Sequence, residues 1–176
     1  MSTLHVENLK GLSSGGNANK IIVPSGQTLQ ASGHIIQVVK MTSSGAVTFA
    51  NTYNAYSTFV TGSITPKSSS SQILVMGTCE LDLGSAAGAN YPAVNVRVVR
   101  GGSQLKQYLY RGYRDSYNNH IILSEPLFYL DSPSSTSSVS YEIQGSNFTG
   151  SSFSGTYSGR ANNYTASDVF LMELAQ

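Results

Sequence analysis

Alternating runs of hydrophobic and polar residues, typical of β-strands with one buried face, recur from residue 34 to residue 176. The clearest alternation lies in residues 58–65, 93–100 and 138–144. No window of a dozen residues carries the 3.6-residue apolar period of an amphipathic helix. The pattern predicts about eight strands, drawn from the runs 34–41, 46–50, 58–65, 72–83, 93–100, 104–110, 120–131, 138–144 and 168–175.

Turn signals divide these runs at the spacing expected of β-sandwiches and jelly rolls. Gly101 and Gly102 predict a tight hairpin between two of the runs. Pro126 cannot donate a backbone hydrogen bond, so its run should lie at a sheet edge or contain a bulge. The last run, 168–175, is dense in apolar residues and should be a core strand. The sequence therefore predicts an all-β, antiparallel β-sandwich of the jelly-roll type.

Residues 1–33 differ from the rest because they are polar, punctuated by glycine and poor in large apolar side chains. So few apolar residues cannot cover a core, and this arm either stays disordered or gains order by packing against other chains. Residues 23–29 place a proline and a glycine between two apolar anchors, which fits a short shaft of three chains around one axis. We expect an N-terminal arm or shaft at 1–33, a head domain at 34–176 and a symmetric oligomer.

Charge is scarce, since only 11% of the residues are charged against about 25% in a typical soluble protein. The formal net charge of +1 provides no field that would attract nucleic acid. No apolar run approaches the roughly 18 residues of a membrane span, and no secretory signal is present, so we expect neither membrane insertion nor export by a signal peptide. The single cysteine, Cys79, should be a small buried hydrophobe. This composition favours an extracellular or virion β-protein over a cytosolic enzyme.

Residues that could support catalysis are scattered. His5, His34 and His120 are far apart in sequence, and no cluster of histidine, cysteine and acidic residues has metal-ligand spacing. Glu80 and Asp82 could form a carboxylate pair on one strand face, but a solvent-facing strand end is the preferred interpretation. We therefore expect a protein that is not an enzyme and that holds no cofactor and no metal.

Basic and tyrosine residues gather between positions 97 and 117. Arginine and tyrosine are favoured at binding hot spots, and aromatic rings can stack on sugar faces. The candidate surface-binding residues are Arg111, Tyr113, Arg114 and Tyr117. The alternative is that these charges are solvated strand faces and a loop that contacts a neighbouring subunit. A second candidate, residues 145–166, sets aromatic residues in a frame of serine, glycine and asparagine. This segment could equally be a long surface loop or a hairpin packed on a neighbouring subunit.

Six segments, in order along nearly the whole chain, resemble fibre and fibre-like structural proteins of tailed bacteriophages, especially those of marine cyanobacteria. They are 1–9 (MSTLHVENL), 22–29 (IVPSGQTL), 33–39 (GHIIQVV), 64–75 (ITPKSSSSQILV), 129–133 (YLDSP) and 170–175 (FLMELA). The resemblance implies a virion protein with a trimeric head, similar in outline to tumour-necrosis-factor-like or C1q-like jelly rolls. It also implies that the arm attaches to other virion proteins of the tail or capsid, with Leu4, Val6, Leu9 and Leu12 as candidate docking residues.

The arm is shorter than that of many such fibres, which leaves three interpretations. The first is a trimeric tail-fibre-like protein whose head contacts the host surface, with host surface polysaccharide as a candidate ligand. The second is a fibre or knob that decorates the capsid. The third is a polysaccharide depolymerase, which the lack of a carboxylate constellation disfavours.

Overall fold

The computed structural model describes residues 13–16, 31–49, 55–85, 93–112, 120–148, 157–161 and 167–176. The chain divides into two compact units, Met1–Gln30 and Ala31–Gln176. Only residues 13–16 of the first unit are described, so the expected arm and its candidate docking residues Leu4, Val6, Leu9 and Leu12 lie outside the described residues. The described residues contain no helix that could cross a membrane.

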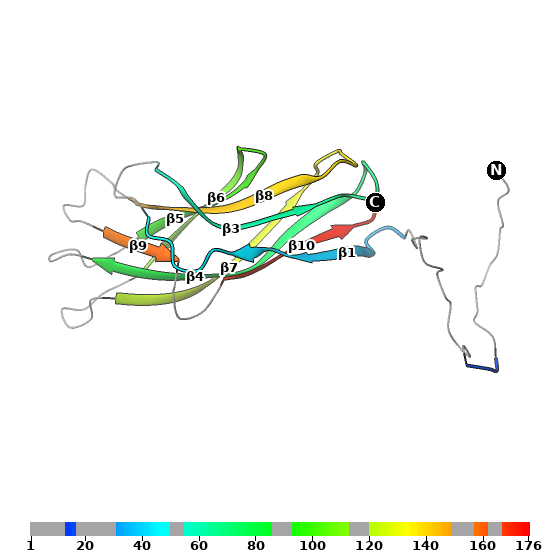
Figure 1. Ribbon diagram of the computed structural model, residues 1–176, viewed down its shortest axis with the longest axis horizontal. Helices are drawn as coiled ribbons and strands as arrows, with labels where there is room; N and C mark the ends of the chain where they lie inside the picture. Colours follow the sequence, from blue (N-terminus) through cyan, green and yellow to red (C-terminus); the bar gives the residue numbers. More distant parts are fainter. Residues whose placement is uncertain are drawn as a thin grey trace. The chain divides into compact units, whose positions relative to one another are not determined.

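The described part of the second unit is built from two antiparallel five-stranded sheets (Figure 1). Sheet A runs in the order β1-β10-β4-β7, with β9 also paired to β4. Its strands are β1 (Ile35–Lys40), β10 (Asp168–Leu174), β4 (Gln72–Ser85), β7 (His120–Asp131) and β9 (Tyr157–Ala161). Sheet B runs in the order β2-β3-β8-β5-β6. Its strands are β2 (Thr42–Ser43), β3 (Ser57–Ile64), β8 (Val139–Asn147), β5 (Ala93–Arg100) and β6 (Ser103–Arg111).

The strand pairings are nested, and this nesting confirms the predicted jelly roll. The outermost pair is β1 with β10, followed by β3 with β8, β4 with β7 and finally the hairpin β5–β6. A long paired ribbon of this kind, folded over on itself, gives two antiparallel sheets joined by Greek-key connections. The strand β10 lies inside sheet A between β1 and β4, as expected for the apolar run 168–175.

Two local predictions are also confirmed. Gly101 and Gly102 have φ angles of +52° and +83°, which only glycine adopts at low cost, and they turn β5 into β6. Pro126 lies in β7, which is an edge strand of sheet A, so its missing N–H does not interrupt the sheet.

The strand predicted at 46–50 is wrong over its described part, because of residues 46–49 only Thr48 makes a single β-bridge and the others belong to no strand. Phe49 instead turns into the sandwich, where its ring lies 5.7 Å from that of Phe59. Gly145 makes room for it, since a Cβ at that position would lie 2.2 Å from the Phe49 ring. A second difference is β9, which lies within residues 145–166, where no strand was among the predicted runs, and which pairs with the end of β4.

Inward-facing side chains of the two sheets form one core, which contains Phe59, Ile73, Leu81, Ile143 and Leu171 among others. Cys79 is fully buried in this core, as predicted, and burial raises the pKa of its thiol to about 12. Burial and not chemistry therefore accounts for the single cysteine.

Candidate functional site

The outer face of sheet A carries an apolar surface that the sandwich itself does not cover. Val38, Met172, Leu74 and Leu130 are cross-strand neighbours in one row over β1, β10, β4 and β7. The next row consists, in order across the same strands, of Lys40 and three apolar residues, Phe170, Met76 and Phe128. We call the seven apolar residues of these two rows the apolar face.

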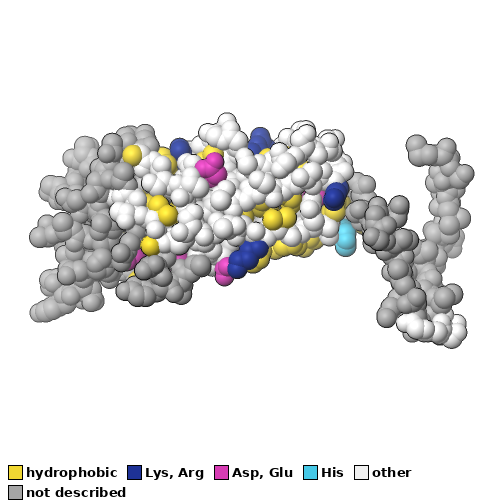
Figure 2. Space-filling view, in the orientation of Figure 1, with side chains coloured by type: hydrophobic (Ala, Val, Ile, Leu, Met, Phe, Trp, Pro, Cys, Tyr) yellow, Lys and Arg dark blue, Asp and Glu magenta, His cyan; other side chains and the backbone are white. Residues whose placement is uncertain are grey.

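Several members of the apolar face are largely exposed, with Phe128 at 58%, Val38 at 52% and Leu130 at 47% of their full accessible surface. Figure 2 shows hydrophobic side chains along the lower edge of the sandwich, beside a basic group and an acidic group. Charge at the rim is balanced, because Lys40 forms an exposed ion pair with Asp168 at 2.6 Å. Contiguous exposed apolar surface is typical of sites that bind a partner, so the apolar face is a candidate interaction site.

The outer face of sheet B has the opposite character. Thr58, Gln144, Arg97 and Gln107 are cross-strand neighbours in a row over β3, β8, β5 and β6. Glu142 lies two residues from Gln144 on β8 and therefore on the same face. We call these five residues, with the neighbouring Tyr56 and Gln104, the polar face.

Sequence reasoning did not identify the polar face as a site, although alternation in 93–100 and 138–144 already placed Arg97, Glu142 and Gln144 on the solvent side of their strands. The missing information was the pairing of β5 with β8, two strands about 40 residues apart in the sequence, which brings these side chains into contact.

The surface-binding residues expected from the sequence are only partly described. Arg111 is the last residue of β6, where it is exposed and its guanidinium carbon lies 5.5 Å from the centre of the Phe148 ring. Tyr113, Arg114 and Tyr117 lie outside the described residues, so the loop that they would form stays a prediction.

The expectation that Glu80 and Asp82 form a solvent-facing strand end is wrong, because these two residues are only 9% and 2% exposed. Ser124 donates a hydrogen bond to Glu80 at 2.7 Å, and the Glu80 backbone N–H donates to the Ser167 hydroxyl at 3.0 Å. The bond from Ser124 explains how the Glu80 carboxylate tolerates burial, and its partner lies 44 residues away in the sequence, where the pattern of one strand does not reveal it.

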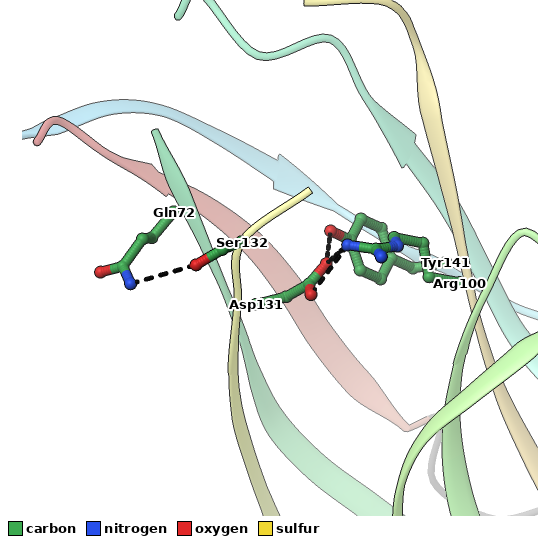
Figure 3. Close-up of polar contacts among 5 residues, drawn as sticks. All are labelled: Gln72, Arg100, Asp131, Ser132 and Tyr141. Atoms are coloured by element: carbon green, nitrogen blue, oxygen red, sulfur yellow. Dashed lines mark hydrogen bonds and ion pairs between the residues drawn. The ribbon is translucent and has the colours of Figure 1, made fainter. Parts of the chain in front are cut away.

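Two further buried carboxylates connect the strands rather than line a cleft. Glu173, fully buried on β10, accepts hydrogen bonds from the Gln37 amide and the Lys67 backbone N–H, both at 2.6 Å. Asp131 binds Arg100 and Tyr141 across the two sheets (Figure 3). Among the described residues, no group of three histidine, cysteine or acidic side chains could hold a metal ion.

Comparison with known proteins assigns no family. No protein-family model matches the chain, and no curated protein matches it. Among solved structures, the chain is similar to one titled "Structure of infectious bursal disease virus Gt strain", with 13% identity and a TM-score of 0.43 over 88% of this chain and 37% of that chain. A VP2 subviral particle of the same virus gives 11% identity and a TM-score of 0.41 over 88% of this chain and 37% of that one. The chain therefore spans well under half the length of these structures.

Proposed function

We propose that this chain is a non-enzymatic structural protein of a bacteriophage particle that assembles as a homotrimer through the apolar face of sheet A. The apolar face is the observation that carries the proposal. A sandwich already has a complete core between its two sheets, so seven apolar side chains on an outer surface need another partner.

A second copy of the same chain fits the apolar face better than a charged partner does. Among the described residues, the charges beside these two rows are Lys40 and Asp168, which neutralise each other. Burying a half-exposed apolar side chain such as Val38, Phe128 or Leu130 contributes on the order of 1 kcal/mol. These three side chains, with the smaller exposed parts of the other four, can together offset the several kcal/mol lost when free molecules associate. An interface around a symmetry axis repeats this gain in every subunit.

The scarcity of charge supports a virion role, because residues that commonly carry enzyme chemistry are few and four of the described acids, Glu80, Asp82, Asp131 and Glu173, are buried. In this proposal residues 1–33 attach the trimer to the tail or capsid through Leu4, Val6, Leu9 and Leu12. The loop with Arg111, Tyr113, Arg114 and Tyr117 contacts the host surface.

The oligomer is tested by size-exclusion chromatography with light scattering on the full chain at micromolar concentration. The expected mass is three times 18.7 kDa. Leu130→Lys should reduce the mass to that of the monomer, because it places a charge in the apolar face. Leu109→Lys is the matched control, since Leu109 is a leucine of similar exposure, 41%, on β6 of the other sheet. A monomeric full chain, or equal loss of mass in both variants, would refute the trimer.

Attachment and host contact have separate tests. Deleting residues 1–33 should leave a folded head that no longer enters particles, and unchanged incorporation would contradict the docking role. Replacing Arg111, Tyr113 and Arg114 with alanine should weaken binding to host cells without lowering the melting temperature. A reconstruction of the particle would show whether the protein sits on the tail or decorates the capsid.

A further inference from the structure

Arg97 lies at the centre of the polar face and is held in one orientation by three neighbours. Its Nε donates to the Gln144 side-chain oxygen at 2.8 Å, and one terminal nitrogen donates to the Gln104 oxygen at 3.3 Å. Its guanidinium carbon lies 3.6 Å from the centre of the Tyr56 ring, in cation–π contact. An arginine fixed in this way presents its remaining donors without the entropy loss that a mobile side chain would suffer on binding.

Glu142 supplies an equally fixed acceptor on the same face. Its Oε2 atom accepts hydrogen bonds from the Thr58 hydroxyl at 2.6 Å and from the Gln144 amide at 2.7 Å. These two bonds, and secondarily the positive charge of Arg97, lower the pKa of Glu142 below its ordinary value. The carboxylate is therefore ionised at neutral pH and acts only as an acceptor.

The described residues do not use all the hydrogen-bonding capacity of Arg97 and Glu142. A guanidinium carries five N–H donors, and the two bonds above use two of them. On Glu142 both bonds go to Oε2, which leaves Oε1 to accept from a further donor. Gln144 bridges the two groups, because it accepts from Arg97 and donates to Glu142.

A donor fork beside a carboxylate oxygen matches adjacent hydroxyl groups on a sugar ring. One hydroxyl oxygen can accept from the guanidinium while its neighbour donates its proton to the carboxylate. One positive and one negative charge cancel, so the site has no preference for an anion. Nucleic acid would require several unpaired cations to neutralise its phosphates.

Amide groups extend the site along the sheet. The Tyr56 hydroxyl donates to the Gln107 side-chain oxygen at 3.1 Å, and the Gln107 amide donates to the Asn95 oxygen at 3.1 Å. Uncharged amides and hydroxyls of this kind can bind further hydroxyls of a longer chain.

From this geometry we propose that the polar face of sheet B binds a neutral oligosaccharide, with Arg97 and Glu142 holding one pair of adjacent hydroxyls. The proposal extends the host contact of the proposed function from the loop after β6 to a sheet face. It rests on that function for its biological setting, but it needs neither the arm nor the trimer.

The test is isothermal titration calorimetry of the full chain with a panel of neutral gluco-, manno- and galacto-oligosaccharides, and with a sulfated oligosaccharide as the anionic arm. We expect at least one neutral oligosaccharide to bind with a Kd between micromolar and millimolar. Arg97→Met and Glu142→Gln should each weaken that binding at least tenfold. Lys106→Met is the matched control, because it also removes an exposed cation from sheet B but lies outside the polar face.

Melting temperature and light scattering on the same samples separate this proposal from the proposed function. Glu142→Gln keeps the size of the side chain, so its binding to the oligosaccharide tests the proposal if Arg97→Met does not fold. Loss of binding with an unchanged oligomer mass supports the site, whatever that mass is. No binding to any neutral oligosaccharide at millimolar concentration, binding to the sulfated chain only, or equal binding by wild type and Glu142→Gln would overturn it.

Discussion

Replacing Arg100 with methionine should destabilise the fold by about 3–5 kcal/mol, because it leaves a buried carboxylate without its cation. Arg100 lies on β5 of sheet B, and one of its terminal nitrogens contacts both Asp131 carboxylate oxygens, at 2.9 and 2.7 Å. Asp131 lies on β7 of sheet A, so this ion pair joins the two sheets (Figure 3). The Tyr141 hydroxyl, from β8, donates to the same carboxylate at 2.6 Å.

The magnitude follows from burial. The Arg100 side chain retains 31% of its accessible surface, but the Asp131 side chain retains only 7%. Water can therefore do little to solvate the Asp131 carboxylate once Arg100 has been removed. Tyr141→Phe removes one hydrogen bond to a charged group and should cost about 1.5–3 kcal/mol. Arg100→Met with Asp131→Leu removes both charges, and the double variant should be more stable than Arg100→Met alone.

Urea unfolding followed by circular dichroism, at one fixed protein concentration, measures these free energies. The control is Lys40→Met, which breaks an ion pair of similar length whose side chains are 61% and 53% exposed. Exposed pairs contribute about 0–1 kcal/mol. If Arg100→Met costs no more than Lys40→Met, or if the double variant is the least stable of the set, the buried pair does not hold the sheets as described.

Three further predictions rest on other parts of the sandwich. Gly77→Ala should cost about 3 kcal/mol or more in urea unfolding, because its Cβ would lie 2.0 Å from the Asp168 carbonyl oxygen, between β4 and β10. Gly16→Ala, with nothing within 4 Å, is its neutral control, and equal stability of the two variants would contradict the close approach. A thiolate-directed disulfide reagent at pH 8 should label Cys79 only after unfolding, because burial raises the pKa of the thiol to about 12. Rapid labelling of the folded protein would contradict this by showing that the thiol is accessible. Burial raises the pKa of Tyr110 and Tyr141 above the ordinary 10.0, so the unfolded state loses these protons first. The stability that these two tyrosines contribute should be constant below about pH 10 and should fall as the pH rises further. Melting temperatures that do not fall between pH 9 and 11 would refute this.

The strands themselves were predictable because the signal for each is local. Alternation marked the runs that became β3, β5 and β8, and two glycines marked the β5–β6 hairpin. Pro126 indicated the edge position of β7. The local signals failed in two places. Residues 46–49 form only a single bridge at Thr48, although Phe49 enters the core as a strand residue would. Glu80 and Asp82 are buried, and the contacts of Glu80 come from Ser124 and Ser167, far away in the sequence.

By itself, the sequence determined the all-β class, the sandwich and the absence of a strong charge field, since side-chain alternation and composition require no knowledge of the partners of each strand. Only the tertiary structure decided which side chains share a face. Val38 meets Met172, and Arg97 meets Gln144, because pairing joins segments separated by tens to more than a hundred residues. Register depends on the whole set of pairings at once, and a shift of one residue would turn each row to the opposite side of its sheet.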